Sequence, residues 1–205
     1  MLPFRKGLNL IILKISAMRY ILSVFSAVTA VIFMSAFSAD NRAPTDSDIL
    51  KATKHLENFE KVNYEPKYIA PVPASLCAPM TPSSSQGDDP HDGKFINVYV
   101  NDKGFAEMTT KKKPAFPEGT MILKEKMAGD SAKKYGAAEL FTVMIKREKG
   151  YNPACGDWEF ASVDVKTSKI ERGKTESCMG CHKNYKTTDF IKRDYLSLKY
   201  MKSLK

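Results

Sequence analysis

Four stretches of the chain show an apolar period of two, and this pattern restricts the fold more than any other feature of the sequence. The stretches are rich in β-branched and aromatic residues and are separated by Gly, Pro, Asn and Asp, which favour turns. They cover residues 94–101, 119–127, 139–148 and 157–165. Because strands that follow one another along a chain commonly pair antiparallel, the sequence predicts an α+β fold, mainly an antiparallel β-sheet with a few flanking helices.

The segments around these strands have the patterns of helices and loops. Residues 45–62 begin with capping residues and predict one amphipathic helix. Its apolar stripe consists of Ile49, Ala52, Leu56, Phe59 and Val62. Residues 65–93 contain six of the eleven prolines, which predicts a long irregular connection without regular pairing. We also expect a short helix within residues 105–113 and a helical tail over residues 182–204. The tail would pack through Phe190, Ile191, Tyr195 and Leu198.

The N-terminal segment has the composition of an export signal. Residues 1–38 contain four basic residues and no acidic one, and residues 21–37 form an uncharged, mainly apolar run. This pattern predicts a secretory signal peptide, cleaved near Ala39 after the small residues Ala36 and Ser38. If it stays uncleaved, the run is nearly long enough to anchor the protein in a membrane. We therefore expect an exported, periplasmic protein.

Length and charge restrict the rest of the chain to an ordinary globular domain. Roughly 165 residues remain after the leader, which is enough for one domain with a real core, starting near residue 45. In it, residues 39–93 would supply the N-terminal helix and proline-rich loop, and residues 94–205 the main domain. The chain carries a net charge of +9, and without the leader its 28 basic and 23 acidic residues give +5. The tight basic run at 111–113 has no interleaved aromatic residues, so we expect no nucleic-acid partner.

A short motif near the C-terminus carries the clearest chemistry. Residues 178–182 read Cys-Met-Gly-Cys-His, the attachment sequence of a c-type haem. Thiols at Cys178 and Cys181 lie about one turn apart and can add to the two haem vinyl groups, and the adjacent His182 then becomes the axial ligand of the iron. A zinc site would need a second ligand pair at a matching interval, and a thioredoxin-like pair would open a helix in a βαβ unit. Neither pattern is present, so we expect one covalent haem c.

The position of the motif indicates the state of the iron. Only 23 residues follow His182, and Met201 is the one methionine among them. Upstream methionines at strand spacing are more often core residues than ligands. We therefore expect an iron bound by His182 on one side and open to small ligands on the other.

Two further cysteines, Cys77 and Cys155, remain outside the motif. In an oxidising compartment, a leftover pair usually forms a disulfide. We expect this bond between Cys77 and Cys155.

Several segments together resemble the cytochrome P-460 and cytochrome c′-β family. They are VYVN at 98–101, FPEGTMILKE at 116–125, VMIK at 143–146, GDWEFA at 156–161 and CMGCHKNYKTTD at 178–189. The resemblance covers about 100 residues. It implies a mainly antiparallel β domain, a homodimer, and one c-type haem with an open distal site. Asn101, Trp158 and Asp189 match positions of the family that we take to be structural.

The resemblance also implies two different activities. Cytochromes P-460 oxidise hydroxylamine with a haem that is additionally cross-linked to a lysine, and the matching residue here is Lys124. The c′-β proteins bind nitric oxide in an apolar pocket without that cross-link, and Ile96, at a position where the enzyme carries an arginine, favours this type. Strand alternation places Thr120, Ile122, Lys124 and Lys126 on one face. Lys124 could therefore be cross-linked, lie near the haem without a bond, or face solvent.

These observations leave the reaction open. The first expectation is oxidation of hydroxylamine or related small nitrogen compounds, which would make the protein a haem oxidoreductase with a redox partner protein. The second is a nitric oxide-binding cytochrome without turnover. The third is a periplasmic electron carrier, which would need a sixth protein ligand on the iron.

Overall fold

The computed structural model describes residues 42–69, 91, 93–129 and 135–204. The chain divides into two compact units, Met1–Arg42 and Ala43–Lys205, and everything below concerns the second. The predicted signal peptide, residues 1–38, lies outside the described residues. Among the helices that are described, none is both long and apolar enough to cross a bilayer.

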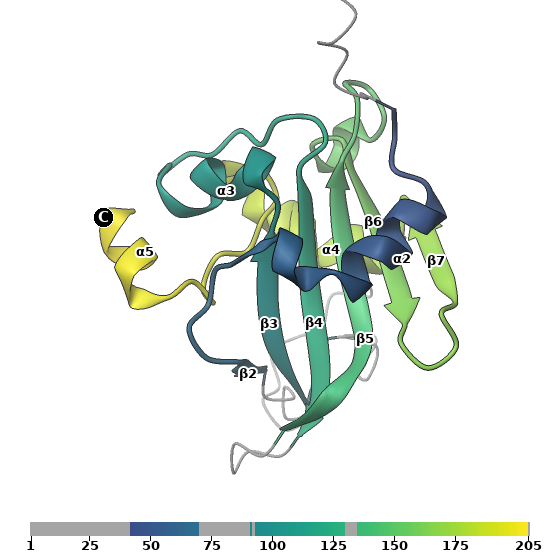
Figure 1. The fold of residues 1–205 in the computed structure, drawn as a ribbon. Coiled ribbons are helices and arrows are strands. Elements are labelled where there is room, and N and C mark those ends of the chain that lie inside the picture. Colours follow the sequence, from purple (N-terminus) through teal and green to yellow (C-terminus); the bar gives the residue numbers. More distant parts are fainter. Residues whose placement is uncertain (1–41, 70–90, 92, 130–134, 205) are drawn as a thin grey trace, which may run out of the picture. The chain divides into compact units, whose positions relative to one another are not determined.

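A seven-stranded antiparallel sheet forms the centre of this unit (Figure 1). Its strands follow the order β1-β3-β4-β5-β6-β7, and β2 pairs with β3 as well. The strands are β1 (Glu60–Lys61), β2 (Lys67–Ile69), β3 (Lys94–Val100), β4 (Met121–Gly129), β5 (Tyr135–Lys146), β6 (Trp158–Asp164) and β7 (Ile170–Gly173). The four predicted strands correspond to β3, β4, β5 and β6, and all of their neighbours pair antiparallel.

Four α-helices surround the sheet in the described part of the chain. They are α2 (Asp46–Lys54), α3 (Asp102–Thr109), α4 (Glu176–His182) and α5 (Leu198–Ser203), with short 3-10 turns at η1 (Leu56–Asn58), η2 (Pro153–Cys155) and η3 (Lys183–Thr188). Figure 1 shows α2 crossing one face of the sheet and α4 lying behind the opposite face. The α+β prediction, mainly antiparallel sheet with a few helices, is confirmed.

Each face of the sheet has its own apolar core because successive side chains of a strand point to opposite faces. On the α2 face, Tyr99, Leu123 and Val143 lie opposite one another and pack with Ile49 and Ala52 of the helix. On the other face, the cluster combines sheet residues with the C-terminal segment. Its sheet members include Ile96, Val98, Val100, Ile122, Met144 and Phe160. This second face is the one on which the residues of the Cys-Met-Gly-Cys-His helix pack.

The N-terminal helix is shorter than its apolar stripe predicts. A capping box at Thr45 and Asp48 starts α2, and the helix ends at Lys54 rather than at residue 62. After the turn η1, the chain becomes extended and joins the edge of the sheet, where the Val62 amide donates to the Val98 carbonyl at 2.9 Å. The helix ends early because an extended chain finds backbone hydrogen-bond partners at the sheet edge. Val62, the last residue of the apolar stripe, is still buried in this extended conformation.

Three other expectations need correction. Residues 67–69 of the proline-rich segment form β2 and pair with β3, so this part of the connection is regular. The helix expected within residues 105–113 begins earlier, at Asp102. The tail is not one helix: residues 189–197 are irregular, and Leu198 is 75% exposed instead of packing.

The irregular tail has tertiary partners in place of helical hydrogen bonds. The Arg193 guanidinium donates to the carbonyl of Met108, in the last turn of α3, and to those of Lys111 and Lys112 just after the helix. These carbonyls lack intrahelical partners, and a cation is favourable at that end of a helix. Side-chain hydrogen bonds to a distant helix therefore override the local preference of the tail.

Candidate haem site

Both motif cysteines and His182 lie on the short helix α4. Cys178 is partly buried, Cys181 is exposed and His182 is buried. Residues three apart on a helix are neighbours on its surface, so both thiols lie on one side. Burial raises the pKa of the Cys178 thiol, and a hydrogen bond with Ser177 and the positive charges of Lys126 and Lys124 oppose part of that shift. The two strand lysines therefore act electrostatically on the cysteine helix.

His182 is held by a backbone carbonyl. Its Nδ1 lies 2.7 Å from the Phe190 oxygen, and its ring centre lies 5.3 Å from that of Phe160. A carbonyl oxygen can only accept a hydrogen bond, so Nδ1 carries a proton, and in the neutral ring the lone pair is therefore on Nε2. A histidine oriented in this way is suited to bind a metal ion through Nε2.

The surroundings of α4 are apolar. Cys178 and Met179 pack against the cluster that contains Phe160, Met144 and Ile96. Ile96 is only 4% exposed and pairs with Lys126 of β4. A buried apolar side chain therefore stands at the position that matches the arginine of the hydroxylamine-oxidising enzymes. A flat, largely apolar macrocycle is compatible with such surroundings.

Two lysines of β4 lie on the same sheet face as this cluster. Lys124 is 8% exposed and Lys126 is fully buried, and their strand partners on β3 are Val98 and Ile96. The Lys124 Nζ lies 5.4 Å from the centre of the Tyr195 ring. The interpretation of Lys124 as a solvent-facing strand lysine is therefore wrong. The alternation of side chains along β4 predicts which face Lys124 occupies, but it does not predict that this face is buried. The residues that cover it, within 190–196, lie more than sixty residues further along the chain.

Comparison with known families identifies the chain. A family model described as Cytochrome P460 matches residues 79–192, which is 114 of the 205 residues. The chain belongs to the cytochrome P460 family. The matched region includes the motif helix α4 and both buried lysines of β4. Among curated proteins, none matches the chain.

Membership in the cytochrome P460 family implies haem binding, and the described residues fit that group. The family match spans two cysteines on one helical turn, an imidazole whose Nδ1 is hydrogen-bonded to a backbone carbonyl, and the apolar cluster beside them. Among the described residues, no cluster of three or more His, Cys, Asp or Glu could hold a bare metal ion. Two thiols on one helical turn with an adjacent imidazole suit an iron that brings its own macrocycle.

Sequence reasoning missed two polar residues near this site, Lys126 and His91. Lys126 shares the face of Lys124 in the alternation pattern, but nothing in the sequence indicates that it is buried. Burial lowers the pKa of His91, and the charges of Lys124, Lys126 and His182 lower it further. Tyr195, which was predicted to pack, is 7% exposed, and burial raises its pKa. The positions of Lys126 and His91 depend on tertiary contacts that leave no local signal.

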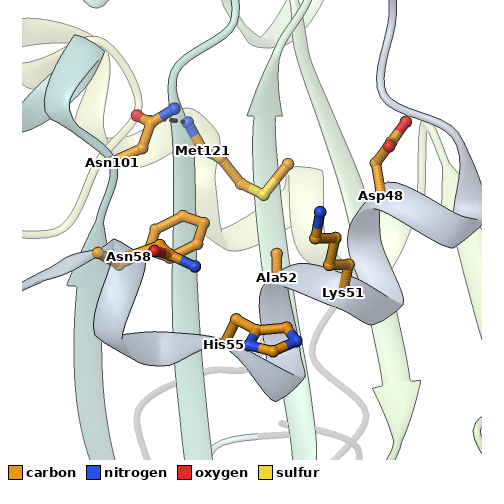
Figure 2. A pocket seen from close by; sticks show the side chains of 8 residues that line it. Asp48, Lys51, Ala52, His55, Asn58, Asn101 and Met121 are labelled. Carbon is orange, nitrogen blue, oxygen red and sulfur yellow. Dashed lines mark hydrogen bonds between the residues drawn. The ribbon is translucent and has the colours of Figure 1, made fainter.

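A concavity lies on the other side of the sheet (Figure 2). It has a volume of about 210 Å³ and lies between α2, η1 and the start of β4. Both ends of the Asn101 side-chain amide, at the edge of the concavity, bond backbone groups: its Nδ2 donates to the Gly119 carbonyl, and its Oδ1 accepts from the Met121 amide. His55 is half exposed and bonds Glu57. Nothing in this concavity connects it with α4.

Cys155 is a buried free thiol in the structure, in the turn before β6. Its proposed partner Cys77 lies outside the described residues. The disulfide therefore stays a prediction.

Proposed function

We propose that this member of the cytochrome P460 family is an exported, periplasmic monohaem protein that oxidises hydroxylamine or a related small nitrogen compound. One haem c would be bound through thioethers at Cys178 and Cys181, with His182 as axial ligand and the opposite face of the iron open. The observation that carries the proposal is the His182 side chain: it is buried, adjacent to the motif cysteines, and held through its Nδ1 by the Phe190 carbonyl. A homodimer and a separate redox partner protein complete the proposal.

The chain's own residues would do four things at this site. Cys178 and Cys181 fix the group covalently, and His182 Nε2 binds its iron. The apolar cluster around Phe160 and Met144 excludes water and lowers the local dielectric. The bound haem would supply the electron transfer and the site for a small nitrogen ligand.

Lys124 is the residue that separates an enzyme from a ligand-binding protein. Its burial on the sheet face that α4 covers supports the proposal that it forms the additional bond to the haem. A covalent bond to the macrocycle changes its shape and electronic properties, which a protein can use to tune a haem. We therefore expect hydroxylamine oxidation to require this bond.

Digestion of the purified protein and mass analysis of its haem peptides tests the proposal. The haem should carry the peptide with Cys178 and Cys181 and a second peptide with Lys124. Lys124→Ala should lose the second peptide and hydroxylamine oxidation together. Lys126→Ala is the matched control, because it removes a buried lysine from the same strand face and should keep both. A wild-type haem attached to the motif peptide alone would refute the cross-link.

Nitric oxide binding is the second candidate, and Ile96 favours it. This buried aliphatic side chain provides no hydrogen-bond donor on the face occupied by Lys124. A binder would take up nitric oxide and carbon monoxide when reduced, without steady-state oxidation of hydroxylamine. An electron carrier would instead have a sixth protein ligand and ignore carbon monoxide. The spectrum of the reduced protein with and without carbon monoxide distinguishes these outcomes.

A further inference from the structure

The carbonyl that orients His182 belongs to an unusual turn. Asp189 and Phe190 both have left-handed backbone conformations, with φ of 51° and 65°. Asp tolerates this region, whereas a bulky residue such as Phe rarely adopts it. Such a turn persists only when its surroundings hold it.

Contacts from the sheet and from the loop before β4 hold Asp189. Its carboxylate accepts from Lys146 Nζ at 2.8 and 2.7 Å and from the Phe116 amide at 2.8 Å. Its carbonyl accepts from Trp158 Nε1 at 2.8 Å. The side chains of Lys146 and Asp189 are each only 14% exposed, so solvent screens this ion pair weakly. The Lys146 Nζ also lies 5.0 Å from the centre of the Trp158 ring.

The space for this turn is provided by a glycine. A Cβ at Gly156 would lie 2.5 Å from the Phe190 ring and 2.9 Å from Asp189 Oδ1. The turn is thus fixed by charge and hydrogen bonds on one side and by close packing on another.

We propose that the Lys146–Asp189 ion pair is a positioning device for the axial histidine. It holds the left-handed turn, the turn aims the Phe190 carbonyl at His182 Nδ1, and that hydrogen bond sets the orientation and basicity of the imidazole. Partners of this kind tune a ligand without touching the metal. Neither Asp189 nor Lys146 contacts the iron in this scheme, so both are positioning residues. The inference rests on the proposed function only in that His182 binds haem iron.

The expected effect of breaking the pair follows from the imidazole. A strong hydrogen bond from Nδ1 gives the ring more anionic character, which strengthens its bond to iron and favours the ferric state. Asp189→Asn keeps the shape and the tolerance for a left-handed turn but removes the charge that binds Lys146. In the ferrous haem protein, we expect the iron–histidine stretching frequency to fall and the reduction potential to become more positive.

The experiment compares Asp189→Asn and Lys146→Met with wild type and with Lys169→Gln, all as full-length haem proteins. Lys169→Gln is the matched control, because it removes a lysine from an exposed ion pair with Glu171. Resonance Raman spectra, reduction potentials and thermal unfolding are measured on these four proteins and on Lys146→Arg. Lys146→Arg should restore both the frequency and the potential, because it retains a cation for Asp189.

Each result has a definite meaning. Shifts in both substituted proteins, absent from Lys169→Gln and reversed in Lys146→Arg, support the inference. If the frequency and the potential are unchanged in Asp189→Asn and Lys146→Met, the inference is wrong. A lower unfolding temperature in these variants would then show that the ion pair only stabilises the fold. If Asp189→Asn does not fold, Lys146→Met and Lys146→Arg give the same decision. A wild-type ferrous protein without an iron–histidine band would show that the iron is not five-coordinate through His182, which is a failure of the proposed function and is recognisable as such.

Discussion

Replacement of Gly156 by alanine should destabilise the protein through the turn that supports His182. Gly156 has φ of 63°, and an added Cβ would lie 2.5 Å from the Phe190 ring, closer than packed carbon atoms approach. A left-handed conformation costs a residue with a Cβ about 1–2 kcal/mol. Forcing a group into a packed site costs about 1–3 kcal/mol more. We therefore expect Gly156→Ala to lower the free energy of unfolding by about 2–5 kcal/mol.

Gly150→Ala separates the two contributions. Gly150 also has a positive φ, 95°, but an added Cβ there would meet no atom within 4 Å. This variant should lose only the conformational part, about 1–2 kcal/mol. Urea unfolding followed by far-ultraviolet circular dichroism gives both values. Equal losses in the two variants would contradict the packing argument, and a loss below about 0.5 kcal/mol in Gly156→Ala would refute the whole reasoning.

Three further predictions follow from other parts of the structure. Glu159→Gln should lower the free energy of unfolding at pH 7 by about 3 kcal/mol, because it removes the buried carboxylate that Arg147 and Arg172 share and leaves them only their exposed acidic partners Glu148 and Asp46. The Glu159 pKa lies below its ordinary value of 4.5, so the difference from wild type should shrink as the pH falls below 4.5 in urea titrations. Cys77 and Cys155 should resist alkylation in the unreduced, denatured protein, and labelling of both thiols would show that they are not bonded. His91→Ala should leave the spin state of the haem unchanged; conversion from low to high spin in this variant would instead identify His91 as a second axial ligand opposite His182.

The sheet could be predicted because its signal is local. In β3 to β6, apolar side chains repeat every second residue, and the pairing of neighbours follows from the order of the chain. The edge strands gave no comparable signal. β2 has three residues and β7 has four, which is too short for a period to be visible, and each forms only because a neighbouring strand offers backbone partners.

Helix ends were less predictable than strands. Helical spacing of apolar residues continues to Val62, yet α2 ends at Lys54, since the same residues reach the core when the chain is extended along β3. The helix predicted for residues 182–204 is interrupted for a similar reason. Phe190, Ile191 and Tyr195 are buried as expected, but hydrogen bonds to the sheet and to the end of α3 hold them in an irregular path.

The sequence by itself determined the donor atoms of the proposed site. Cys178, Cys181 and His182 lie within five residues, and covalent chain geometry alone brings them onto one short helix. Only the tertiary structure decided what surrounds them. The burial of Lys124 and Lys126, and the Phe190 carbonyl at His182 Nδ1, depend on segments that are far apart in the chain or on a turn that distant side chains hold. Burial is a property of what packs over a residue, and no local pattern records which distant segment will do so.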